Sequence, residues 1–301
     1  MSLKNTLQGT GVAIVTPFKK NLHVDYDALE NLIDNLIESG VEYVVTLGTT
    51  GETPTLAKDE MTDIINCTYD KVNKRVPVVV GIGGNNTTQL LENLKSFPLD
   101  KATAILSSSP NYNKPSQEGL FQHYKIFSEA SPKPVILYNV PGRTGSNITA
   151  ETTLRLATEC ENIAGIKEAS GIMIQCMHIL KDKPENFLVV SGDDHLAFPL
   201  IACGMDGVIS VAANCFPKDF SEMVRYLLAF DLNNARKLQY KLLDGLDLLF
   251  AENNPAGVKA FLAEMGMIEN VLRLPLVPLS AQLNQKVKDF VSELFVSNPV
   301  S

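Results

Sequence analysis

Short apolar runs alternate with amphipathic segments along most of this 301-residue chain, and this alternation constrains the fold more than any other feature. The runs are rich in β-branched residues and nearly continuously apolar, which is typical of parallel strands that are covered on both faces. They lie at residues 11–18, 43–48, 77–84, 102–110, 134–141, 163–170, 187–194 and 207–215. A helical segment follows each of the first seven. The segment from Asp25 to Gly40, for example, has apolar residues at the i, i+3, i+4, i+7 spacing of one helix face.

Eight strand–helix units predict an α/β protein of the (β/α)8 TIM-barrel class, which typically needs about 250 residues. A doubly wound open sheet is the structural rival. That fold favours a glycine-rich phosphate turn after its first strand, and "TPFKKN" at residues 16–21 is not one.

The strand pattern stops near Pro217. The following sequence predicts two helices with a break near Asp231–Asn234, a further helix in "NPAGVKAFLAEMG", and another in the region Ala281–Val296. We therefore expect a barrel core over residues 1–216 and a C-terminal helical appendage over residues 217–301 that packs on the barrel or on a neighbouring subunit.

Charge and composition exclude several classes of protein. The net charge is −8 and no block of Lys or Arg occurs, which argues against a nucleic-acid partner. No apolar run approaches the roughly 18 residues that a membrane span needs, and the first residues do not resemble a signal peptide. The five cysteines include no C-x-x-C pair, which fits a reducing compartment, so a cytoplasmic location is expected. The four histidines are scattered, and no metal site is predicted.

The chemistry of a barrel lies at the carboxyl ends of its strands, and Lys167 occupies such an end in "GIKEAS". A lysine amine is a nucleophile only when it is neutral, and burial in an apolar barrel disfavours its cationic form. A buried lysine is therefore suited to attack a carbonyl and form a Schiff base. The alternative is a structural lysine that extends to the rim or pairs with Glu168.

Other strand ends supply groups that suit the same chemistry. Tyr138 lies as far into its strand as Lys167 does, so both side chains should point inward at a similar height, where a phenol could transfer protons. Thr49 and Thr50 offer hydroxyl and backbone N–H groups for a carboxylate. Arg143 could bind a second carboxylate. Each residue taken alone also has a structural explanation, but together they describe a site for a 2-oxo acid and a second anionic substrate.

The motifs "GTTGE", "SPNYNKP", "YNVPGRT" and "GIKEASG", in this order and spacing, resemble the pyruvate-dependent class I aldolases of the N-acetylneuraminate lyase superfamily. The similarity runs from "GVAIVTPF" to at least "NPAGVKAFL". Within the superfamily, the chain is most similar to the members that condense pyruvate with aspartate 4-semialdehyde in diaminopimelate and lysine biosynthesis. No metal or organic cofactor is implied.

The resemblance also implies roles for individual residues. Lys167 would form the Schiff base with pyruvate, and Tyr138, Thr50 and Tyr112 would form a proton relay. Pyruvate would be held by Thr49 and Thr50 and by backbone groups of two further residues, Gly192 and Ile209. Arg143 would bind the carboxylate of the semialdehyde.

The resemblance further implies a homotetramer, a dimer of dimers in which Tyr112 reaches the site of a neighbouring subunit. Lysine-inhibited relatives carry His, His, Glu and Tyr where this chain has Lys58, Met61, Gln89 and Asn111. Lys58 would repel a bound lysine cation, and Gln89 lacks the carboxylate that could pair with it. We therefore expect weak or absent inhibition by lysine.

Three other functions remain open from the sequence. An aldolase for N-acetylneuraminate or a 2-keto-3-deoxy sugar acid would share Lys167, Tyr138 and the threonine turn, although Arg143 and the "YNKP" tyrosine favour an anionic semialdehyde. A non-catalytic protein that binds 2-oxo acids is disfavoured because every catalytic position is filled. An enzyme that carries pyridoxal phosphate on Lys167 would be yellow.

Overall fold

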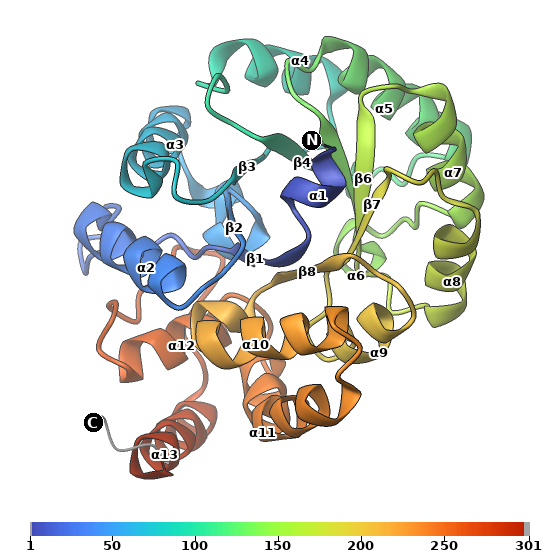
Figure 1. Ribbon diagram of the computed structural model, residues 1–301. Helices are drawn as coiled ribbons and strands as arrows, with labels where there is room; N and C mark the ends of the chain where they lie inside the picture. The colour runs from blue at the N-terminus through green and yellow to red at the C-terminus, as the bar shows by residue number, and fades with distance from the viewer. Residues whose placement is uncertain (1, 298–301) are drawn as a thin grey trace.

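Eight parallel strands close into one barrel, as the sequence predicts (Figure 1). The computed structural model describes residues 2–297, with side chains described to residue 294. Each strand pairs with the next, and β8 pairs with β1. The strands are β1 Gly9–Ala13, β2 Tyr43–Thr46, β3 Val78–Gly81, β4 Ala104–Ser108, β5 Val135–Asn139, β6 Ile163–Glu168, β7 Leu188–Ser191 and β8 Gly207–Ser210.

Most of the α-helices surround the strands and cover their outer faces (Figure 1). They are α1 Leu3–Thr6, α2 Tyr26–Glu38, α3 Lys58–Val72, α4 Thr87–Ser96, α5 Gln117–Ala130, α6 Pro141–Thr144, α7 Ala150–Glu159, α8 Met173–Asp182, α9 Ala197–Ala202, α10 Pro217–Leu228, α11 Leu232–Phe250, α12 Ala256–Glu264 and α13 Ala281–Ser297. Three short 3-10 turns are η1 Thr49–Gly51, η2 Thr53–Thr55 and η3 Ala212–Asn214. None of the helices within residues 2–297 has the length and apolar character that a membrane span requires.

The helix α2 shows how the local sequence sets these boundaries. The Asp25 side chain accepts a hydrogen bond from the Ala28 N–H at 3.2 Å and caps the first turn. Gly40 follows the last turn with φ of +87°, a conformation that favours glycine. The predicted segment Asp25–Gly40 is thus confirmed as a helix, Tyr26–Glu38, with three flanking residues.

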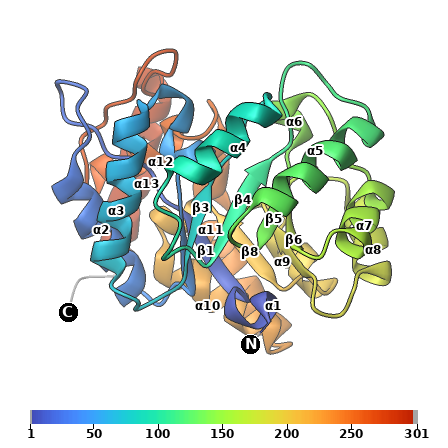
Figure 2. The same ribbon diagram turned by 90° about the horizontal axis from the view of Figure 1, so that it is seen from above.

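The barrel interior is filled by inward-facing side chains, and its amino-terminal end is closed by α1. Leu7, which follows α1, is fully buried against the inner residue Tyr43. Figure 2 shows α1 at the end of the barrel opposite α6. The interior is therefore a packed core below the carboxyl ends of the strands, and these ends are left to form a site.

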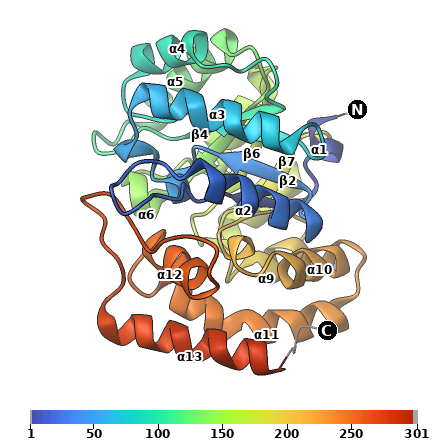
Figure 3. The ribbon, with the colours of Figure 1, turned by 90° about the vertical axis from the view of Figure 1, so that its left-hand side faces the viewer.

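The region after β8 is helical, as predicted. The first helix, α10, contacts β1, β8 and α9 and takes the eighth place in the ring. The predicted break near Asp231–Asn234 lies between Leu228 and Leu232, where α10 ends and α11 begins. The helices α11 and α13 pack against each other and lie outside the ring (Figure 3).

A buried ion pair connects the C-terminal region to the barrel. Lys259 of α12 and Glu52, which follows η1, are both fully buried, and Lys259 Nζ lies 2.5 Å from Glu52 Oε1. The ammonium also donates to the Val271 carbonyl oxygen at 2.9 Å and lies 4.1 Å from the centre of the Phe18 ring. Burial lowers the pKa of Lys259 to about 8, although the adjacent Glu52 favours the charged form.

We expect Lys259→Met to lower the free energy of unfolding by about 3–5 kcal/mol, because it leaves the Glu52 carboxylate buried without its cation. Chemical denaturation followed by circular dichroism measures the change. Lys101→Met is the control, because Lys101 pairs with Asp70 at 3.3 Å on the exposed surface, where such a pair contributes at most about 1 kcal/mol. Equal losses in the two variants would contradict this role of the buried pair.

Candidate active site

A cavity of about 780 Å³ opens at the carboxyl ends of the strands. Six of the predicted site residues line it: Thr49, Thr50, Tyr138, Arg143, Lys167 and Gly192. They come from the segments after β2, β5 and β7 and from β5 and β6 themselves. The closed barrel thus brings together residues that lie far apart in the sequence.

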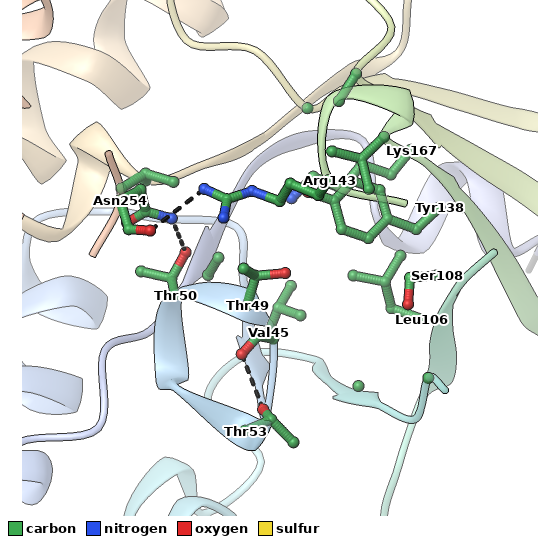
Figure 4. Close-up of a pocket in the computed structure, with 18 of the residues that line it drawn as sticks. Val45, Thr49, Thr50, Thr53, Leu106, Ser108, Tyr138, Arg143, Lys167 and Asn254 are labelled. Atoms are coloured by element: carbon green, nitrogen blue, oxygen red, sulfur yellow. Dashed lines mark hydrogen bonds between the residues drawn. The ribbon is translucent and has the colours of Figure 1, made fainter. Parts of the chain in front are cut away.

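Lys167 lies near the end of β6 and is only 4% exposed. Its Nζ atom is 4.4 Å from the centre of the Tyr138 ring on β5 (Figure 4). Tyr138 and Lys167 are direct partners in the β5–β6 register, which is the common height that the sequence predicts. Among the described residues Lys167 forms no ion pair, so the predicted structural alternative, a pair with Glu168, is not observed.

Gly192 makes room for the lysine side chain. A Cβ atom at this position would lie 2.7 Å from Lys167 Cε and 2.7 Å from Ala169 Cβ. Such distances are well below normal contact, so any other residue at 192 would displace the amine. The Gly192 N–H donates to the Glu168 carbonyl oxygen at 2.8 Å, which fixes the glycine beside β6.

The threonine turn begins directly after β2 and is held by left-handed residues on both sides. Leu47 has φ of +56° and Glu52 has φ of +54°, and η1 lies between them. Thr50 is 2% exposed, whereas Thr49 is partly exposed to the cavity. The ion pair of Glu52 with Lys259 anchors the end of this turn.

Asn254 is a site residue that the sequence analysis missed. Its Nδ2 donates to Thr50 Oγ1 at 2.9 Å, and its carbonyl oxygen accepts from Arg143 Nη2 at 3.3 Å (Figure 4). Asn254 precedes α12, far from any strand end, so an inspection of strand ends could not find it. The only signal was its place within the segment "NPAGVKAFL", which belongs to the region of resemblance.

Arg143 lies in the short helix α6 directly after β5 and is exposed. Within residues 2–294 no carboxylate lies within 4.0 Å of its guanidinium. An arginine that lines a cavity without an ionic partner can bind a ligand carboxylate through two parallel hydrogen bonds.

Two predicted site residues lie outside this cavity. Tyr112 is 87% exposed, and it adopts φ of +70° while its N–H donates to the Thr144 carbonyl oxygen at 3.3 Å. Ile209 is buried inside the barrel, where β8 pairs it with Gly11. The single chain therefore does not bring the Tyr112 side chain to Lys167.

The segment after β7 adds acidic groups and a histidine to the cavity wall. Asp194 Oδ2 accepts from the N–H groups of Val211 and Ala212 at 2.9 and 3.0 Å, and burial raises the pKa of this carboxyl group. His195 Nε2 lies 3.0 Å from Asp247 Oδ1 of α11. The sequence predicts a strand that ends near residue 194, but it predicts no role for Asp194 or His195. In the described part of the chain, no group of three His, Cys, Asp or Glu side chains is arranged to hold a metal ion.

Comparison with known proteins agrees with this geometry. The model of the dihydrodipicolinate synthetase family matches residues 6–294. A 4-hydroxy-tetrahydrodipicolinate synthase from Flavobacterium psychrophilum is 50% identical over 286 residues, which are 95% of this chain and 98% of the relative.

Solved structures give the same result. A chloride-inhibited dihydrodipicolinate synthase from Acinetobacter baumannii, complexed with pyruvate, has a TM-score of 0.93 and 43% identity, and the match covers 96% of this chain and 99% of that one. A monomeric dihydrodipicolinate synthase variant has a TM-score of 0.94 and 40% identity, with coverage of 97% and 98%. With its barrel, its buried lysine and a family match over nearly the whole length, this chain belongs to the dihydrodipicolinate synthetase family.

Proposed function

We propose that this protein is a 4-hydroxy-tetrahydrodipicolinate synthase, a lyase that condenses pyruvate with L-aspartate 4-semialdehyde through a Schiff base on Lys167. The observation that carries the proposal is the buried Lys167 amine, which lies against the Tyr138 ring and lines a cavity of a fitting size. The relatives at 46–50% identity carry this enzyme name, which supports the substrates.

The first half of the reaction takes place at Lys167. The neutral Nζ attacks the C2 carbonyl carbon of pyruvate, and water leaves as the iminium forms. The pyruvate carboxylate lies on the Thr49–Thr50 turn, beside the amine. Loss of a C3 proton converts the iminium to the enamine, which is the carbon nucleophile.

Proton transfer in these steps falls to hydroxyl groups. The Tyr138 ring lies 4.4 Å from Lys167 Nζ, so its phenol is the proposed proton donor and acceptor, and the buried Thr50 hydroxyl accepts from Asn254 Nδ2 at 2.9 Å. Asn254 fixes the Thr50 hydroxyl by donating to its oxygen, so the hydroxyl hydrogen is directed away from the asparagine.

The second substrate binds above the first. Arg143 takes the carboxylate of aspartate semialdehyde, and the enamine carbon attacks the aldehyde carbon. The amine of the bound substrate then attacks the iminium carbon, which closes the ring and releases Lys167 as the free amine. The reaction needs no electron acceptor, since every step is an addition, an elimination or a proton transfer.

The first test is pyruvate-dependent consumption of aspartate semialdehyde by the pure protein, together with borohydride reduction in the presence of pyruvate and mass mapping of the adduct. We expect turnover and an adduct on Lys167, both abolished in Lys167→Ala. An adduct without turnover would favour the sugar-acid aldolase reading and direct the assay to N-acetylneuraminate and 2-keto-3-deoxy sugar acids. Absence of both would favour a protein that only binds 2-oxo acids.

The functional unit that we propose is a homotetramer in which Tyr112 enters the site of an adjacent subunit. The support is its position, because Tyr112 is 87% exposed and does not line the cavity of its own chain. One similar solved structure is a monomeric variant, so the fold does not require assembly.

Mixing two inactive variants tests this arrangement. In a Tyr112→Phe and Lys167→Ala hybrid pair, one site contains both native residues, so activity should return at about a quarter of the sites in a random mixture of two-fold dimers. The separate variants and a mixture that is prevented from exchanging subunits serve as controls. No recovery after proven exchange would place Tyr112 outside the neighbouring site.

We also propose that lysine is a weak inhibitor or none. Met61 and Asn111 line the cavity, as does Asn85, whose Nδ2 donates to the Asn111 carbonyl oxygen at 3.4 Å. Gln89 is uncharged, and its Nε2 donates to Glu92 at 3.0 Å. In the effector site that the resemblance implies, a diamino acid would meet Lys58 and would lack a carboxylate partner at position 89.

Millimolar L-lysine should leave the rate of condensation nearly unchanged. Gln89→Glu combined with Lys58→His should increase the inhibition, because it restores a carboxylate and removes a cation. Initial rates with increasing lysine measure both effects, and Lys101→His serves as a distant control. Submillimolar inhibition of the native enzyme would refute the proposal.

We place the enzyme in the cytoplasm. All five cysteines are free thiols, and burial raises the pKa of Cys67 to about 11 and of Cys176 to about 12. Thiols that remain protonated react slowly with disulfides, which is consistent with structural roles in a reducing compartment.

A further inference from the structure

A second pair of side chains lies directly behind the catalytic pair. Asn139 follows Tyr138 on β5, and Glu168 follows Lys167 on β6. Successive strand residues face opposite sides, so Tyr138 and Lys167 face the barrel interior while Asn139 and Glu168 face the surrounding helices. The register pairs Asn139 with Glu168 just as it pairs Tyr138 with Lys167.

Asn139 and Glu168 bind each other across the two strands. Asn139 Nδ2 lies 3.2 Å from Glu168 Oε1 and 3.0 Å from Oε2. Both residues are buried, at 0% and 1% exposure. Hydrogen bonds to a buried carboxylate are stronger than those between neutral groups, and the loss of one leaves an unsatisfied charge.

Every hydrogen bond recorded at the Glu168 carboxylate comes from an N–H donor. Besides Asn139, Gln175 Nε2 of α8 donates to Oε2 at 3.1 Å, and the Ser170 N–H donates to Oε1 at 2.7 Å. Among the described residues no cation lies within ion-pair distance of this carboxylate. The charge is therefore held by directional hydrogen bonds, which fix position more strictly than an exposed ion pair does.

Asn139 is fixed in turn by the segment that follows α6. Its Oδ1 accepts from the Ile148 N–H at 2.9 Å, and its Nδ2 also lies 2.8 Å from Asn147 Oδ1. Backbone hydrogen bonds also join these strand ends. The Ala169 N–H donates to the Asn139 carbonyl oxygen at 2.9 Å, and the Gly192 N–H donates to the Glu168 carbonyl oxygen at 2.8 Å. The network thus reaches three consecutive strands at the height of the Lys167 amine.

We propose that Asn139 and Glu168 are positioning residues that hold the Tyr138 phenol and the Lys167 amine in the geometry needed for proton transfer at the Schiff base. The inference rests on the proposed function. The carboxylate acts through the backbone of β5 and β6, and it touches neither substrate nor reacting atoms. An error of about 1 Å in such an arrangement can cost about a hundredfold in rate.

Glu168→Gln tests the proposal with almost no change in size. The new amide group must face one of the donors that now bind the carboxylate. At least one hydrogen bond to residue 168 is therefore lost, while the side chain keeps its size. Asn139→Ala removes the other partner and serves as a second test. Asp206→Asn is the control. Asp206 is also a buried carboxylate that accepts from a strand N–H, that of Val189 at 2.9 Å, but it pairs with Lys4 and Lys183 and lies before β8 at the opposite end of the barrel.

Two measurements with pyruvate alone separate positioning from folding. The extent of borohydride-trapped adduct at saturating pyruvate reports the Schiff base, and the rate of deuterium uptake into the pyruvate methyl group reports proton transfer at C3. We expect Glu168→Gln and Asn139→Ala to keep the native extent of adduct and to lower the exchange rate by about tenfold to a hundredfold. Asp206→Asn should lower the thermal midpoint but keep the native ratio of exchange to adduct.

The outcomes distinguish this inference from the proposed function. If the native protein forms the adduct and exchanges deuterium, but the two variants exchange at the native rate per adduct, the positioning role is wrong and the proposed function stands. Parallel losses of adduct and exchange in all three variants would likewise show a purely structural role. If the native protein forms no adduct, the proposed function fails, and this inference fails with it.

Discussion

Closure of the parallel barrel is the constraint on which the site depends. Because every strand runs in the same direction and β8 pairs with β1, all eight carboxyl ends meet at one rim. Residues as distant in sequence as Thr50 and Asn254 can then lie 2.9 Å apart. The Glu52–Lys259 pair fixes the helical region to this rim, so the C-terminal part of the chain contributes to the cavity wall as well as to the outer surface.

Two buried lysines illustrate how environment separates structural from chemical roles. Lys259 is fully buried and contacts the Glu52 carboxylate and the face of the Phe18 ring. Its role is therefore structural, since it joins α12 to the barrel. Lys167 is nearly as buried, but it lines a cavity and lies beside a tyrosine, and no carboxylate within the described residues lies at ion-pair distance. Lys259 is therefore paired with a protein carboxylate, whereas the Lys167 amine is available to a ligand.

The sequence alone predicts the barrel because its strands are continuously apolar and its helices repeat with a clear period, as in the segment that became α2. Most cavity residues can also be predicted, because they lie at the ends of apolar strand runs or directly after them, as Thr50, Tyr138 and Lys167 do. Asn254 could not be predicted in this way, because its place in the cavity results from tertiary packing before α12 and not from a local pattern. The Asn139–Glu168 contact required the register of β5 and β6, which no periodicity specifies. The role of Tyr112 depends on a neighbouring subunit and stays a prediction.

The packed interior of the barrel restricts how solutes can reach Lys167. Fully buried side chains of Leu7, Tyr43, Val45, Ile136 and Val190 fill the interior below the rim. Solutes can therefore approach the Lys167 amine only from the side of the rim, and the deeper ligand must enter before the shallower one. Arg143 of α6 lines the same cavity as the Lys167 amine. Under the proposed function, the oxo acid and the second substrate share this one entrance, and the oxo acid binds first.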